Sequence, residues 1–240
     1  MILRKRNGLL LQKNEDMKQF PSKFEKEYFQ GDKSNYTTCY DYKMGNISYL
    51  YTKKALPILK RSLDTKAKIL DLGCAFGNLL SMLDKKGYKT YGLDISQYAI
   101  AKARKITKAD LALGDVNKEL PYNNNFFDAV FALDIIEHLN SPIEFVHEVA
   151  RVVKKNGNFF IHTPNINSIF EKIFKEKWFG YRDDSHLYLF NKKNLKFLVE
   201  KAGFEVFINE TISYPLPSIL RQLLKNTDLG GSLWMVARKI

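Results

Sequence analysis

The sequence predicts an α/β fold in which helices cover both faces of a mostly parallel, doubly wound sheet. From residue 67 onward, short apolar runs that suit strands alternate with longer segments of helical periodicity. Such alternation is typical of parallel strands joined by crossover helices. One helix start is especially clear, with Ser141 as the N-cap, Pro142 at the first helical position and Glu144 three residues after the cap.

The periodicity assigns each element in turn. The expected strands are 68–72, 88–93, 110–114, 127–133, 158–163, 204–211 and 232–238. The expected helices are 46–63, 78–86, 96–107, 142–154, 192–202 and 219–225. Pro57 lies inside the first of these helices, where it is expected to kink or divide it. Residues 1–45 are rich in aromatic side chains and are interpreted as a cap segment over the mouth of a single domain at 46–240.

Composition limits the class of protein. A chain of 240 residues is long enough for one well-buried core, and its hydrophobic content of 45% is typical of a globular protein. Cys39 and Cys74 are the only cysteines, which makes a disulfide framework unexpected. No apolar run approaches the roughly 20 residues of a membrane helix, and we expect a cytoplasmic enzyme.

The net charge of +12 allows three kinds of partner: an anionic small molecule, a nucleic acid or an acidic membrane surface. The lysines are scattered along the chain rather than gathered in one block. This scatter favours a solvated basic surface and a small-molecule acceptor, anionic or neutral, over a nucleic acid. The sequence gives no indication of the oligomeric state.

The most informative stretch is 68–80, where an apolar strand passes through a turn containing Gly73 and Gly77 into a helix. Glycine lets a backbone approach a ligand closely. Asp94 ends the next strand, 23 residues after Asp71, and an acid about 20 residues beyond such a turn typically binds ribose hydroxyls. The glycine spacing is not that of a dinucleotide site, and Asp71 just before the turn would repel a pyrophosphate. A ribose-bearing ligand with cationic groups fits better.

These residues resemble motif I of the class I S-adenosylmethionine (SAM)-dependent methyltransferases, D/E-x-G-x-G-x-G, with Ala75 in place of the middle glycine. The resemblance implies a Rossmann-like fold of seven strands whose last strand is antiparallel. It implies that Asp94 binds ribose, and that Asp115 and the backbone of Val116 bind adenine. The implied residues for SAM, or its product S-adenosylhomocysteine (SAH), are Asp71, Gly73, Cys74, Ala75, Gly77, Asp94, Ile95, Asp115, Val116 and Asp134.

A second group of residues follows the fourth strand of the predicted domain, at the edge where open α/β sheets bind ligands. Asp134, Glu137 and His138 resemble the D-x-x-E-H element of the branch that includes ubiquinone-biosynthesis and sugar methyltransferases, and 186–190 resembles its later H-L-x-x-F element. We interpret these three residues and His186 as candidate catalytic residues, with the two histidines as general bases. The ordinary alternative is that each histidine is structural.

The same four side chains, Asp134, Glu137, His138 and His186, resemble the set with which RNA 3′-end methyltransferases hold a divalent metal. The sequence therefore predicts a SAM-dependent O- or N-methyltransferase acting on a small metabolite, with a sugar or glycan precursor as the expected acceptor. The alternatives are an RNA ribose 2′-O-methyltransferase that uses a divalent metal, and a non-catalytic SAM-binding module.

Overall fold

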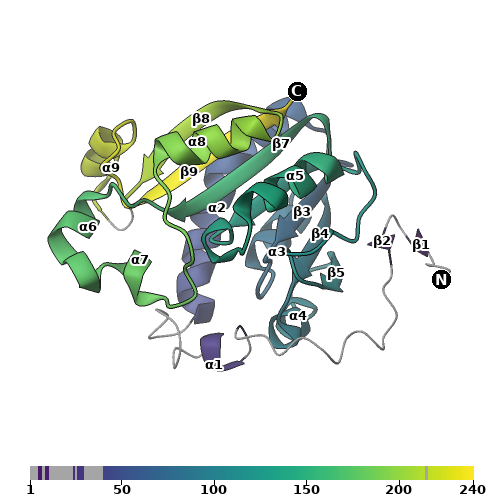
Figure 1. The fold of residues 1–240 in the computed structure, drawn as a ribbon. Coiled ribbons are helices and arrows are strands. Elements are labelled where there is room, and N and C mark those ends of the chain that lie inside the picture. The colour runs from purple at the N-terminus through teal and green to yellow at the C-terminus, as the bar shows by residue number, and fades with distance from the viewer. Residues whose placement is uncertain (1–4, 7–8, 11–23, 25, 30–39, 214–215) are drawn as a thin grey trace.

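Seven strands of the computed structural model form one sheet, in the spatial order β5-β4-β3-β6-β7-β9-β8 (Figure 1). The described residues are 5–6, 9–10, 24, 26–29, 40–213 and 216–240. The strands of the sheet are β3 (Lys68–Leu72), β4 (Lys89–Asp94), β5 (Asp110–Leu113), β6 (Phe127–Leu133), β7 (Val153–Pro164), β8 (Phe204–Ile212) and β9 (Ser232–Lys239). Only β9 runs opposite to the others, antiparallel to both β7 and β8. The predicted fold class is confirmed.

Helices cover both faces of the sheet (Figure 1). On one face, α2 (Tyr40–Ser62) and α3 (Asn78–Asp84) pack on a core that includes Ile69. On the other, α5 (Pro142–Val152) and α8 (Lys192–Lys201) pack on a core that includes its neighbour Leu70. Consecutive residues of a strand point to opposite faces. The continuous apolar runs of the sequence are therefore explained by a sheet that is buried on both sides.

The remaining elements are short. They are β1 (Lys5–Arg6), β2 (Leu9–Leu10), α1 (Lys26–Phe29), α4 (Gln97–Ala103), α6 (Ile169–Phe174), α7 (Phe179–Arg182) and α9 (Ser218–Leu224), with the 3-10 helices η2 (Ile136–His138) and η3 (Lys175–Lys177). Most of the cap segment predicted for 1–45 lies outside the described residues, and its boundary stays a prediction.

Several element bounds differ from the sequence predictions: α2 begins at Tyr40 instead of 46, and α4 ends at Ala103 instead of 107. Helix α2 continues through Pro57 instead of dividing there. Strand β7 begins at Val153, directly after α5 ends, and is therefore longer than the predicted strand at 158–163. Its first residue pairs with Phe127, and the register shifts before the regular ladder starts.

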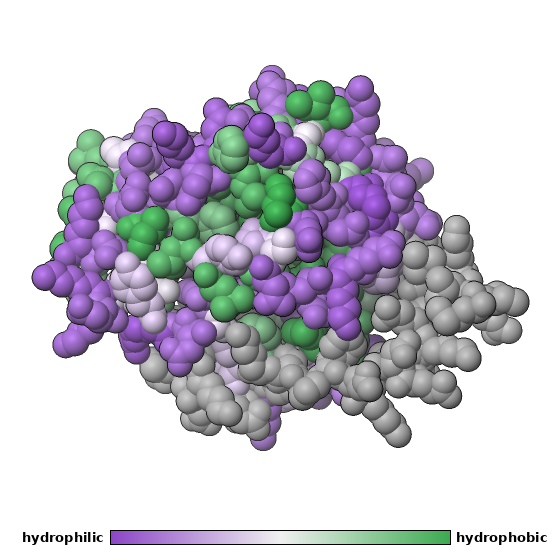
Figure 2. Space-filling view, in the orientation of Figure 1, coloured by the Kyte–Doolittle hydropathy of each residue, from purple (hydrophilic) through white to green (hydrophobic). Residues whose placement is uncertain are grey.

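The surface is mainly hydrophilic on the face shown in Figure 2, with apolar side chains in separate small areas. This pattern agrees with a solvated exterior. Among the described residues, no helix has both the length and the apolar character needed to cross a membrane.

Candidate active site

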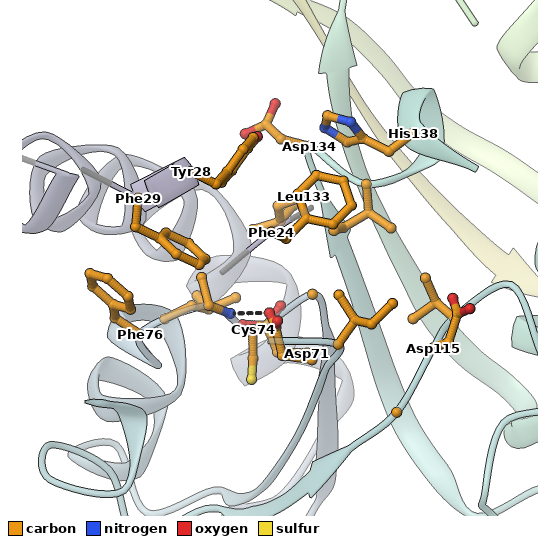
Figure 3. Close-up of a pocket in the computed structure, with 18 of the residues that line it drawn as sticks. Phe24, Tyr28, Phe29, Asp71, Cys74, Phe76, Asp115, Leu133, Asp134 and His138 are labelled. Carbon is orange, nitrogen blue, oxygen red and sulfur yellow. Dashed lines mark hydrogen bonds between the residues drawn. The ribbon is translucent and has the colours of Figure 1, made fainter. Parts of the chain in front are cut away.

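A pocket opens at the carboxyl ends of β3, β4, β5 and β6, the edge predicted for ligand binding (Figure 3). Asp71 and Cys74 lie on one side of it, and Asp134 and His138 lie on the opposite side (Figure 3). Among the predicted site residues, those that line the pocket are Asp71, Gly73, Cys74, Ala75, Asp94, Ile95, Asp115, Val116, Asp134 and His138. The described lining does not include Gly77, Glu137 or His186.

The turn after β3 needs its glycines for two reasons. Gly73 and Gly77 have φ values of 71° and 77°, which side chains disfavour. A Cβ on Gly73 would also lie 1.9 Å from the Ile135 Cδ1 atom, so the Ile135 side chain would have to move to admit one. Ala75, the residue that departs from the motif, has a φ of 45° and tolerates this left-handed conformation at a cost of roughly 1 kcal/mol. The turn thus keeps its shape despite the missing glycine.

Asp94 is fixed at the end of β4 by backbone amides. Its Oδ2 atom accepts a hydrogen bond from the Ala75 amide at 2.7 Å, and its Oδ1 atom accepts one from the Ser96 amide at 2.8 Å. The first bond joins the acid directly to the glycine turn. Each carboxylate oxygen has a second lone pair, so a held Asp94 can still accept from the hydroxyls of a ribose.

Asp71 is buried beside Asp94, with 4% of its surface exposed. Burial raises the pKa of Asp71 well above its usual value, and the negative charge of Asp94 raises it further. No salt bridge among the described residues neutralises Asp71. A cationic ligand in this pocket would relieve that unfavourable charge. These two acids therefore fit a molecule that carries both a ribose and an ammonium or sulfonium group.

Asp115 and Val116 line the pocket after β5, and Asp115 lies on the side away from Phe29 and Phe76 (Figure 3). The Asp115 Oδ1 atom accepts a hydrogen bond from the Asn117 amide at 2.9 Å, which sets the carboxylate in the turn. Cys74 lines the pocket beside Asp71, and burial raises the pKa of its thiol, which keeps it neutral.

Aromatic side chains form one wall of the pocket. Phe24, Tyr28 and Phe29 come from the predicted cap segment, and Phe29 packs on Phe76 with their ring centroids 4.8 Å apart. The hydroxyl of Tyr28 donates a hydrogen bond to the buried Asp183 at 3.0 Å, tying this wall to the segment before the H-L-x-x-F element. The described part of the cap segment therefore lies against the pocket.

Asp134 does not join the other three residues of the predicted quartet. Its carboxylate accepts hydrogen bonds from His162 Nδ1 at 2.7 Å and from the Tyr51 hydroxyl at 3.2 Å. Burial raises the pKa of Asp134, but the charge and hydrogen bond of His162 and the hydrogen bond of Tyr51 outweigh burial, so the net pKa is lowered. Asp134 is an ionised carboxylate on the pocket wall, and the structure gives it partners that the sequence analysis did not name.

Glu137, His138 and His186 do lie together, with one potential ligand atom of each within 4.8 Å of the others. Glu137 is 1% exposed and accepts a hydrogen bond from the Thr163 hydroxyl at 3.0 Å through Oε2. Its Oε1 atom is buried and has no hydrogen-bond partner among the described residues. Burial raises the pKa of Glu137 well above its usual value, and the negative charge of Asp134 adds to that effect. The structure thus brings together three of the four side chains that the RNA-methyltransferase alternative assigns to a divalent metal.

Hydrogen bonds assign the tautomers of the two predicted bases. The Ser185 hydroxyl donates to Asp183, so it must accept from His138 Nδ1, 2.8 Å away, which leaves His138 Nε2 unprotonated. His186 donates from Nδ1 to the Gly180 carbonyl at 2.8 Å. Burial and the nearby His186 lower the pKa of His138 to about 4, so its ring is neutral near pH 7. Only His138 of the two lines the pocket.

Sequence reasoning missed His162 and Tyr51. His162 interrupts an otherwise apolar stretch near the carboxyl end of β7, where a polar residue faces the ligand edge of the sheet. The position of His162 at this edge could have identified it as a candidate site residue. No feature of the sequence marked Tyr51 as a site residue, because it occupies an ordinary apolar position of a long helix.

The comparisons with known proteins agree with this geometry. A family model described as a methyltransferase domain matches residues 45–207. The fold is that of a class I SAM-dependent methyltransferase, and the chain belongs to this methyltransferase family.

The individual relatives match this chain over only part of their length. Over 112 residues the chain is 33% identical to the mitochondrial ubiquinone biosynthesis O-methyltransferase of Dictyostelium discoideum, covering 40% of this chain and 35% of that protein. The ubiquinone biosynthesis O-methyltransferase of Alkalilimnicola ehrlichii is 33% identical over 113 residues, covering 42% of each chain. The chain thus spans less than half the length of these curated relatives.

Solved structures show the same fold at low identity. A SAM-dependent methyltransferase structure from Thermotoga maritima superimposes with a TM-score of 0.63 at 22% identity, covering 82% of this chain and 91% of the other. At this identity the similarity supports the fold alone.

Proposed function

We propose that this chain transfers a methyl group from SAM to an oxygen atom of a small hydroxylated metabolite. The observation that carries the proposal is the single pocket in which Asp71, Asp94 and the Gly73 turn face Asp134 and His138. The first three residues suit the methyl donor, and the last two suit an acceptor. The names of the curated relatives favour oxygen over nitrogen as the methylated atom.

Each residue has a definite task in this proposal. SAM supplies a methyl group already activated by its positive sulfur. Asp94 would hold the ribose hydroxyls, Asp71 would pair with the ammonium, and Asp115 with Val116 would contact the adenine. The aromatic wall would exclude water from the acceptor. Much of the rate of such a displacement comes from alignment and desolvation.

The acceptor is proposed only as a class. A sugar or glycan precursor stays the prediction of the sequence analysis, and the aromatic wall beside Asp134 and His138 also suits a phenolic ring that carries hydroxyls. A cytoplasmic location likewise stays a prediction.

Two measurements test the proposal. Calorimetry should show that the chain binds SAH, and a tritiated-methyl assay with a panel of 3,4-dihydroxybenzoate, UDP-glucose and a short RNA should show transfer to one of the two small molecules. Failure to bind SAH would contradict the proposal outright. Binding of SAH with transfer to no acceptor, including those of a cell lysate, would favour a non-catalytic SAM-binding module instead.

A metal-assisted methyltransferase is the second candidate, favoured by the unpartnered Glu137 Oε1 atom near the two histidine rings. A divalent cation at Glu137, His138 and His186 would lower the pKa of an acceptor hydroxyl. Activity that EDTA abolishes and Mg²⁺ or Mn²⁺ restores would support it. Activity on RNA alone, with steep salt dependence, would point to the RNA methyltransferase alternative.

A further inference from the structure

The backbone of Asp134 is tied to one residue of the neighbouring strand. The parallel pairing of β6 with β7 places Leu133 opposite His162. Immediately after β6, the amide of Asp134 donates a hydrogen bond to the carbonyl oxygen of His162 at 3.0 Å. Asp134 also has a φ of 56°, a conformation that needs support from its surroundings.

The side chain of His162 also hydrogen-bonds to Asp134. An ionised carboxylate cannot donate, so His162 Nδ1 donates to Asp134 Oδ1 across 2.7 Å. The other ring nitrogen, Nε2, lies 2.7 Å from the Ser232 hydroxyl on β9. The ring is thereby fixed at both ends, between two strands of the sheet.

The two side chains differ in their access to the pocket. The side chain of Asp134 is 29% exposed and lines the pocket, whereas that of His162 is 9% exposed and lies behind it. Tyr51 completes the support, since its hydroxyl donates to the second carboxylate oxygen of Asp134 at 3.2 Å and also lies 2.8 Å from His162 Nδ1. The other charged or titratable groups that act on Asp134 are His138 and Glu137. A buried imidazole thus orients a pocket carboxylate.

We propose that His162 is a positioning residue that aims the Asp134 carboxylate at the acceptor group, so that Asp134 accepts the proton of the hydroxyl being methylated. This inference rests on the proposed function and adds a residue that neither the methyltransferase motifs nor the sequence analysis assigns. It makes Asp134, and not His138 or His186, the group that receives the proton.

The proton transfer balances without any further reactant. The acceptor oxygen forms a bond to the methyl carbon while the bond from that carbon to sulfur breaks and leaves its electron pair on sulfur. The hydroxyl proton passes to a carboxylate oxygen of Asp134, which later releases it to water. A methylated oxonium is strongly acidic, so even a weakly basic carboxylate can take its proton.

Sinefungin tests this arrangement without a known acceptor. This analogue carries an amine where SAM carries its methylated sulfur, whereas SAH has neither the methyl group nor the charge. The ratio of the SAH to the sinefungin dissociation constant therefore reports on the group that faces the transferred methyl. We expect wild type to prefer sinefungin by about tenfold or more, and Asp134→Asn to lose the preference.

Two variants of similar size separate positioning from a general structural role. In His162→Asn the side-chain amide can take the place of Nδ1 and still donate to Asp134. In His162→Gln it reaches the place of Nε2 and Ser232 instead. We expect His162→Asn to keep most of the preference and His162→Gln to lose it, both with nearly unchanged SAH affinity. His147→Asn, at an exposed histidine of α5, is the control.

The outcomes are distinct. Equal preferences in wild type, His162→Asn and His162→Gln would overturn the inference, as would a wild type that binds SAH and sinefungin equally. A wild type that binds neither ligand would overturn the proposed function itself. With a methylated probe from the panel, His162→Gln should lower kcat at an unchanged KM for SAM, and His162→Asn should restore it.

Discussion

The two sides of the pocket are built in different ways. On the cofactor side, Asp94 is held by the amides of Ala75 and Ser96, all within one strand-turn-helix and the strand beside it. On the acceptor side, Asp134 is held by the side chains of Tyr51 and His162, which lie 83 and 28 residues away. Local backbone geometry fixes the first side, and packing of distant elements fixes the second.

This difference indicates which side of the pocket tolerates substitutions. Gly73 and Gly77 on the cofactor side tolerate few substitutions, because an added Cβ would lie 1.9 Å and 3.0 Å, respectively, from another atom. A wall made of side chains from separate elements can exchange them one at a time. We therefore expect loss of an acid on the cofactor side to weaken cofactor binding and variants on the acceptor side to alter selectivity.

The largest effect is expected for Asp94→Ala. Loss of hydrogen bonds from two ribose hydroxyls to a charged acceptor, about 1.5–3 kcal/mol each, should weaken SAH binding by roughly a hundredfold or more. Calorimetry measures it, with Glu119→Ala at an exposed position as the control. If the Asp94 variant bound SAH like wild type, the cofactor side would be wrongly assigned.

Gly73→Ala tests the claim that the Ile135 side chain would have to move to admit a side chain in the turn. The new Cβ would lie 1.9 Å from Ile135 Cδ1 at a φ of 71°, and we expect the free energy of unfolding to fall by about 3 kcal/mol. Gly203→Ala is a matched control, because its φ is 90° but nothing lies within 4 Å of the added Cβ. That variant should lose only about 1 kcal/mol. Equal losses in urea unfolding would show that contact with Ile135 is unimportant.

Asp71→Asn should stabilise the ligand-free chain while weakening SAH binding. Burial, then Asp94, raises the pKa of Asp71 above its usual 3.8, so ionisation opposes folding. The wild type therefore loses this stability as the pH rises above about 4, and the neutral variant does not. At pH 8 we expect the variant to gain about 1 kcal/mol in urea unfolding. A gain that is the same at pH 4 and pH 8 would contradict the assignment to charge; Asp228→Asn is the exposed control.

Tyr51→Phe sharpens the comparison from the acceptor side. It removes a hydroxyl that lies 3.2 Å from Asp134 Oδ2 and 2.8 Å from His162 Nδ1, and it leaves the bond between His162 and Asp134 in place. We expect SAH affinity to stay within about twofold and the preference for sinefungin to fall by about threefold. A large loss of SAH affinity would instead mean that the two sides are not independent.

The smallest effect is expected for Ala75→Gly. The φ of 45° favours glycine, so the change should stabilise the chain by about 0.5–1 kcal/mol and leave SAH affinity unchanged or slightly higher. Thermal unfolding with and without SAH measures both quantities. Destabilisation would show that the Ala75 methyl group packs usefully in the turn.

The cofactor side could be predicted from sequence because its determinants are close together in the chain. Gly73, Gly77 and Asp94 lie within two successive strand-turn units, and their spacing alone carries the geometry. The order of elements likewise predicted the sheet, including its antiparallel last strand. The family match confirms the class of protein, while the role of each residue stays a prediction.

The acceptor side could be predicted only in part. Spacing grouped Asp134 with Glu137 and His138, but the left-handed φ of Asp134 turns its side chain toward His162 instead. No local sequence pattern predicts the left-handed backbone conformation of Asp134. The hydrogen bond between Tyr51 and Asp134 depends on how α2 packs against the sheet, and local sequence patterns do not predict that packing.

A structure of the chain with bound sinefungin tests the central claim most directly. The account predicts the ribose hydroxyls within hydrogen-bond distance of Asp94 and the analogue's amine within hydrogen-bond distance of Asp134. An analogue bound outside this pocket would contradict the account, and so would one whose amine points away from Asp134.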